Sequence, residues 1–107
     1  MTPSEAVLLA RWPRIVRELM ARTNLFPRRL RFTLSQRIDD LALSIMGSLV
    51  DATFSRSKRH AALEEVNLGL EKLRLLIRIA YEEECLSHGA FEHLVRELDE
   101  CGRMVGG

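Results

Sequence analysis

The chain has 107 residues, which is enough for one compact domain and too short for two independent hydrophobic cores. Its 47% apolar and 29% charged residues exclude a disordered chain, and its six glycines, three prolines and 6% aromatic residues leave little material for a β-sandwich or barrel. The formal net charge is +1, yet residues 1–59 hold eleven basic and five acidic residues, whereas residues 60–107 hold five basic and ten acidic ones.

Two interpretations of this charge asymmetry are open. A basic surface in the first half of the chain would bind phosphate groups or an acidic partner. Alternatively, the opposite charges pair with one another, either within one molecule or between subunits. The sequence alone does not decide between them.

Four helices are expected, because the residues that interrupt helices fall at only a few places along the chain. The expected helices cover residues 5–22, 28–55, 58–84 and 88–105. Pro13 should either start the regular part of the first helix or kink it. The second helix would have about 28 residues and a length of about 42 Å, and Ser87 is the expected N-cap of the fourth. The sequence thus predicts one all-α domain over residues 1–107.

Both central helices carry more apolar residues than one core-facing stripe requires. The core stripes are Leu34, Ile38, Leu41, Ile45, Leu49 and Ala52 on the second helix and Leu63, Val66, Leu70, Leu73, Ile77 and Ala80 on the third. The apolar residues outside these stripes are Phe32, Leu43, Val50 and Phe54 on the second helix and Leu68, Leu75, Leu76 and Ile79 on the third. One small bundle cannot bury both sets, so we expect self-association through the outer set. The alternative is that each wide apolar arc contacts two neighbouring helices within one bundle.

No catalytic or metal-binding arrangement is expected. The histidines are scattered, no phosphate-binding loop motif occurs, and the adjacent carboxylates of residues 82–84 would radiate outward from a helix. Cys85 and Cys101 lack a CxxC spacing and should both be free thiols. We therefore expect no enzyme activity, no cofactor, no metal and no small-molecule substrate.

A membrane partner is not expected either. No window approaches the about 20 uncharged apolar residues of a membrane span, and the first residues do not resemble a secretory signal. The interpretation is a cytoplasmic protein with reduced thiols.

Arginine outnumbers lysine fourteen to two, which favours phosphate binding or ion-paired interfaces because guanidinium groups match both geometries. Four of these residues gather around the start of the second expected helix: Arg22, Arg28, Arg29 and Arg31. Two others, Arg74 and Arg78, lie on the polar strip of the third helix. The simpler interpretation of this second pair is intrahelical pairing, Glu71 with Arg74 and Arg78 with Glu82.

Three segments of the chain together resemble a known family. They are FPRRLRFTL at residues 26–34, LEKLRLLIRIA at 70–80 and LDECGRMVGG at 98–107. In this order and at this separation they are similar to the accessory variability determinant family of diversity-generating retroelements. That family lies within a wider group of small four-helix proteins that includes proteins encoded in intervening sequences of ribosomal RNA genes. The resemblance extends from Trp12 onward.

The resemblance implies an up-down antiparallel four-helix bundle that assembles into a homopentameric barrel. It also implies a non-enzymatic accessory protein that binds the reverse transcriptase of the retroelement and RNA or DNA, and so supports mutagenic reverse transcription. Arg74 and Arg78 match the LR…R pattern of the family and become a second candidate binding set. The alternative is a stand-alone four-helix oligomer of the wider group with a structural or interaction role.

Overall fold

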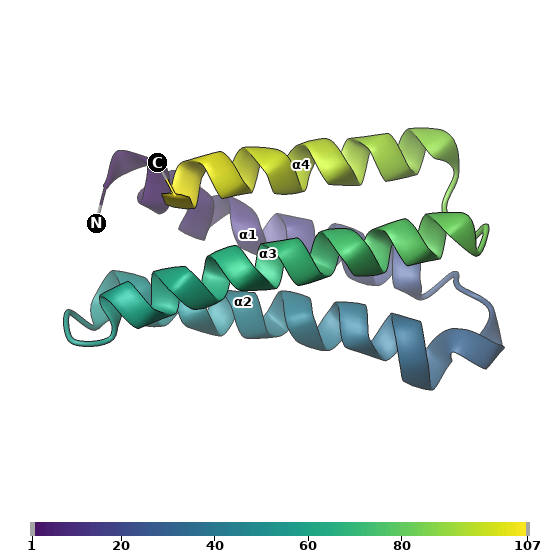
Figure 1. Ribbon diagram of the computed structural model, residues 1–107, viewed down its shortest axis with the longest axis horizontal. Helices are drawn as coiled ribbons and strands as arrows, with labels where there is room; N and C mark the ends of the chain where they lie inside the picture. The colour runs from purple at the N-terminus through teal and green to yellow at the C-terminus, as the bar shows by residue number, and fades with distance from the viewer. Residues whose placement is uncertain (1, 107) are drawn as a thin grey trace.

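The computed structural model describes residues 2–106, which form four α-helices and no strand. The helices are α1 (Pro3–Thr23), α2 (Gln36–Phe54), α3 (Arg59–Glu82) and α4 (His88–Gly106). Each helix packs antiparallel against the next and α1 also contacts α4, so the four form an up-down bundle (Figure 1). Both chain ends lie at one end of the bundle, and the α1–α2 and α3–α4 connections lie at the other. The predicted all-α fold is therefore confirmed.

The first helix starts at a capping box. Thr2 Oγ1 accepts a hydrogen bond from the Glu5 backbone N–H at 3.1 Å, and the Thr2 N–H donates to Glu5 Oε2 at 3.0 Å. Pro3 follows at the first helical position, where a missing N–H costs nothing. The helix then continues through Pro13, so this proline does not start the regular part of the helix.

The second helix begins later than the sequence predicts. Residues 28–35 were expected to be α-helical, but they form a 3₁₀ turn, η1 (Arg28–Leu30), and a π-helical turn, η2 (Arg31–Ser35). Pro27 precedes η1 and offers no side-chain cap, so nothing starts a regular α-helix there. A π turn holds an extra residue compared with an α turn, so it changes the angular position of Phe32 relative to the residues of α2.

The last two helices match their predicted spans within one or two residues at each end. Glu84 terminates α3 with a left-handed backbone conformation (φ 63°), and the Cys85 N–H bonds back to the Ala80 carbonyl at 2.8 Å. The predicted N-cap of α4 is confirmed, because Ser87 Oγ accepts the Ala90 N–H at 3.1 Å.

The predicted core stripes of α2 and α3 face the interior, with Leu41 and Leu63 half-buried and the other members buried. From α1, Trp12 fills the centre of the core, and its indole N–H donates to the Ala42 carbonyl at 2.9 Å. The helices α2 and α3 pack tightly at Gly69, where a Cβ atom would come within 2.7 Å of Ile45 Cγ1. A larger residue at this crossing would force the Ile45 side chain to shift.

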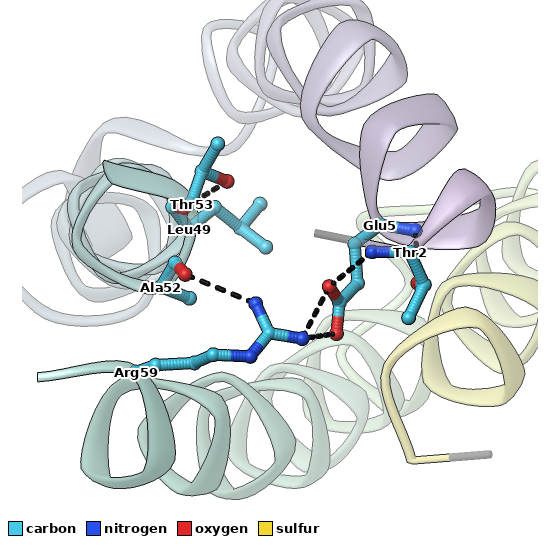
Figure 2. Close-up of polar contacts among 6 residues, drawn as sticks. All are labelled: Thr2, Glu5, Leu49, Ala52, Thr53 and Arg59. Atoms are coloured by element: carbon cyan, nitrogen blue, oxygen red, sulfur yellow. Dashed lines mark hydrogen bonds and ion pairs between the residues drawn. The ribbon is translucent and has the colours of Figure 1, made fainter. Parts of the chain in front are cut away.

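An ion pair ties three helices together at the end where the chain starts (Figure 2). Arg59, the first residue of α3, places Nη2 2.6 Å from both carboxylate oxygens of Glu5 on α1. Its Nη1 donates to the carbonyl of Ala52 on α2 at 3.1 Å. Glu5 is buried, and its hydrogen bond from Arg59 lowers the pKa of its carboxyl, although burial opposes this shift.

Glu5→Gln should lower the free energy of unfolding at pH 7 by about 1–3 kcal/mol, because it removes the charge from a buried hydrogen-bonded pair. Glu64→Gln, an exposed carboxylate on α3, is the matched control. Urea unfolding at several pH values would measure both variants.

Since the folded-state pKa of Glu5 is depressed, the stabilisation is present above the ordinary pKa of 4.5 and disappears as the pH falls through the lower folded value. The wild-type and Glu5→Gln unfolding curves should therefore converge in acid. A stability difference that stays constant down to about pH 2 would contradict this role for the ion pair.

Candidate functional site

The described chain offers no candidate metal centre: within residues 2–106, no group of three His, Cys, Asp or Glu side chains could hold a metal ion. Cys85 and Cys101 are both free, as the sequence predicts. Burial raises the pKa of the Cys101 thiol to about 11, so this cysteine is poorly suited to act as a nucleophile. Among the same residues, no helix combines the length and apolarity that crossing a membrane would need.

Exposed apolar side chains remain on the outer sides of both α2 and α3. They are Leu43, Val50 and Phe54 on α2 and Leu68, Leu75 and Ile79 on α3, and we call these six residues together the α2/α3 face. The alternative that neighbouring helices within the chain bury these residues is therefore wrong for all six. It holds for Leu76, which is half-buried and packs against the core. An open groove of about 570 Å³ lies between α2 and α3, and of the six residues only Leu75 lines it. The other lining residues are Leu41, Leu76, Arg37, Asp40, Ser44 and Lys72.

Phe32, which the sequence groups with Leu43, precedes α2 in the chain. It is 79% exposed and belongs to η2, where it lines a different groove beside Arg17 and Gln36. The prediction had assumed one continuous α-helix from residue 28, which would place Phe32 in line with Leu43. The π turn breaks that continuity.

The predicted arginine cluster lies at the end of the bundle that carries the α1–α2 connection (Figure 1). The side chains of Arg22, Arg28 and Arg31 are exposed, and no ion pair among residues 2–106 includes them. Arg29 differs, because its Nη2 lies 3.2 Å from Glu83 Oε1 at the end of α3. Within the described residues, one member of the cluster thus has an exposed ion-pair partner and the other three have none.

Arg74 and Arg78 form the ion pairs that the sequence predicts. Arg74 pairs with Glu71, and Arg78 Nε lies 3.8 Å from Glu82 Oε2. The sequence did not predict that Arg74 Nε also donates to Asp99 Oδ1 on α4 at 2.8 Å. Arg74 is mostly buried, with 22% of its side chain exposed, whereas 67% of Arg78 is exposed. Arg74 therefore joins α3 to α4.

Two residues beside the arginine cluster carried no signal in the sequence. Arg17 on α1 and Ser35 on η2 line one groove of about 730 Å³ together with Arg28, Arg31 and Phe32. Arg17 precedes Arg28 by eleven residues along the chain, and the turn between α1 and α2 brings the two into one groove. Residues of α1 and of the α1–α2 connection therefore form this groove together.

Comparison with models of protein families gives a match to the bAvd-like family over residues 6–107. Because the match covers nearly all of the sequence, this four-helix chain belongs to the bAvd-like family. The resemblance to the accessory variability determinant family is thereby confirmed. Comparisons with curated proteins and with solved structures find no match.

Arg74→Gln should lower the free energy of unfolding by about 1–2 kcal/mol, because it breaks a partly buried charged link between α3 and α4. Arg78→Gln removes only an exposed pair and should change stability by less than about 0.5 kcal/mol. Chemical denaturation of both variants at neutral pH measures the difference. Equal effects would mean that Arg74 does not hold the two helices together.

Proposed function

We propose that this protein is a non-enzymatic accessory subunit of a diversity-generating retroelement. In this role it assembles into a homopentamer, binds the reverse transcriptase of the element and binds RNA or DNA, and so supports mutagenic reverse transcription. Membership of the bAvd-like family carries the proposal. Two surfaces support the proposal. The apolar α2/α3 face is suited to self-association, and the basic arginine cluster is suited to nucleic acid.

The α2/α3 face supports self-association. Six large apolar side chains remain exposed on two adjacent helices, and exposed apolar side chains that gather in this way are typical of a surface that binds a partner. A second copy of the chain would cover it, and a cyclic arrangement would close the assembly without leaving a free apolar face. The number five comes from the family resemblance.

The arginine cluster supports binding of nucleic acid. Arg22, Arg28 and Arg31 present guanidinium groups without ion-pair partners among the described residues, and such groups bind phosphate in a forked geometry. In a cyclic oligomer the cluster would be repeated around the axis, so that several weak phosphate contacts act together. Arg74 and Arg78 are less suited, because acidic neighbours on α3 and α4 already hold them.

Leu43→Glu or Leu75→Glu should dissociate the oligomer, since each places an unpaired charge in the buried interface. Val7→Glu is the matched control, because Val7 is similarly exposed but lies on α1. Sedimentation equilibrium at micromolar concentration should give five times the chain mass of 12.3 kDa for the wild type and the control, and a smaller mass for the two variants. A wild-type monomer would contradict the proposed assembly.

Binding of RNA or DNA should depend little on base sequence and fall steeply as salt rises, because phosphate contacts release counterions. Arg28→Glu combined with Arg31→Glu should abolish binding, whereas Arg74→Glu combined with Arg78→Glu should mainly reduce stability. Filter binding or fluorescence anisotropy across a salt series measures this. If the wild type binds neither a polynucleotide nor reverse transcriptase at low salt, the stand-alone oligomer of the wider four-helix group becomes the better interpretation.

A further inference from the structure

The groove between the C-terminal part of α1 and the η1–η2 segment combines two of the arginines assigned above to phosphate binding with features that the proposed function does not use. Its volume is about 730 Å³, which lies within the range of pockets that hold small ligands. Arg17, Arg28 and Arg31 line it, and no ion pair among residues 2–106 includes any of the three. The groove is therefore suited to an anionic ligand.

The second feature is Phe32, whose side chain is 79% exposed although it lies next to arginines. Phe26, in the same connection, is buried in the core, so Phe32 is not needed to anchor this segment. An exposed aromatic ring offers a flat face on which another flat ring can stack.

The third feature is Ser35, which is 8% exposed and whose hydroxyl has no hydrogen-bond partner among the described residues. A serine within a helix usually satisfies its hydroxyl by bonding to a carbonyl of the preceding turn. Here Ser35 is the last residue of η2 and lines the groove. An unsatisfied buried hydroxyl is unfavourable, but the Oγ atom of Ser35 has almost no exposed surface, so a ligand in the groove would bond to it only if the groove lining shifts.

We propose that this groove binds one unpaired nucleotide of a single-stranded RNA or DNA, with its base stacked on Phe32 and its flanking phosphates held by Arg28 and Arg31. This inference rests on the proposed binding of nucleic acid and assigns it a strand type and a site. A base within a duplex is stacked on both faces, so Phe32 cannot reach it without unpairing. Single strands should therefore bind in preference to duplexes.

The groove also holds two carboxylates, which would repel the phosphates of a strand that runs through it. They therefore favour the binding of one nucleotide over that of a continuous strand. Asp39 and Asp40 line the same groove as the arginines, and Asp39 Oδ1 accepts a hydrogen bond from Thr23 Oγ1 at 2.7 Å. Asp40 is exposed, and its carboxylate can accept hydrogen bonds from the amino group of a cytosine or adenine base while it repels a phosphate. Bases with an amino group should thus bind somewhat more tightly than thymine.

The test measures anisotropy of a fluorescently labelled ten-nucleotide single-stranded DNA and of the duplex of the same sequence. Phe32→Leu, which keeps an apolar side chain but removes the ring, should weaken single-strand binding about 10-fold and leave duplex binding unchanged. Phe32→Tyr keeps the ring and should bind like the wild type. Leu25→Ala is the matched control, because Leu25 is 78% exposed in the same connection but does not line the groove.

Sedimentation of each variant checks that the oligomeric mass is unchanged. Arg28→Gln and Arg31→Gln should weaken single-strand binding more than Arg29→Gln, whose arginine already pairs with Glu83. Equal binding of single strand and duplex, with Phe32→Leu indistinguishable from Leu25→Ala, would overturn the groove assignment while leaving nucleic-acid binding intact.

Two other results would also overturn the assignment. If Phe32→Leu removes reverse transcriptase binding and leaves oligonucleotide binding unchanged, the groove binds a protein segment instead. If Phe32→Leu lowers the oligomeric mass, Phe32 belongs to the subunit interface. A wild type that binds no oligonucleotide at low salt would contradict the proposed binding of nucleic acid itself, which is a separate failure.

Discussion

The close approach of α2 and α3 at Gly69 is the constraint that sets how the two central helices pack. A side chain at this position would collide with Ile45, so the absence of one lets the two helices pack more extensively than any other pair. Their core stripes then meet inside the bundle, and their outer apolar residues remain exposed. Arg59 holds the start of α3 against Ala52 and Glu5, which keeps this pair aligned with α1 (Figure 2).

Charge pairing within the fold determines which arginines remain available. The acidic second half of the chain neutralises Arg29 and Arg74 through Glu83 and Asp99, across elements that lie far apart in sequence. What remains is an unpaired basic end around the α1–α2 connection, which the net charge of +1 does not reveal. A protein with almost no net charge can therefore still carry a local phosphate-binding surface.

Apolar periodicity predicted most of the fold because the helix spans and the core stripes follow directly from the spacing of apolar residues. The same periodicity could not predict η1 and η2, since 3₁₀ and π turns place apolar residues at spacings that resemble those of an α-helix. Residues 28–35 were consequently assigned to one regular helix. The predicted exposure of Leu43 and Leu75 agrees with the structure, whereas Leu76 is half-buried because the edge of a wide apolar arc reaches the core.

The candidate site was only partly predictable, because it depends on contacts between residues that lie apart in the sequence. Arg28, Arg29 and Arg31 are adjacent in sequence and easily recognised as a cluster, but only the folded chain separates the paired Arg29 from its neighbours. Arg17 and Ser35 join the cluster through the turn after α1, and no sequence pattern marks either one. Tertiary contacts, rather than local propensity, decide which residues of the cluster face an open groove.

The central claim is that this chain works as the accessory subunit of a reverse transcriptase. The most direct test mixes the purified protein with the reverse transcriptase of a diversity-generating retroelement from the same genome and measures the mass of the product by size-exclusion chromatography with light scattering. We expect a stable complex that contains the reverse transcriptase and a pentamer of this 12.3 kDa chain. Two separate peaks at low salt, each with the mass of the free protein, would contradict it.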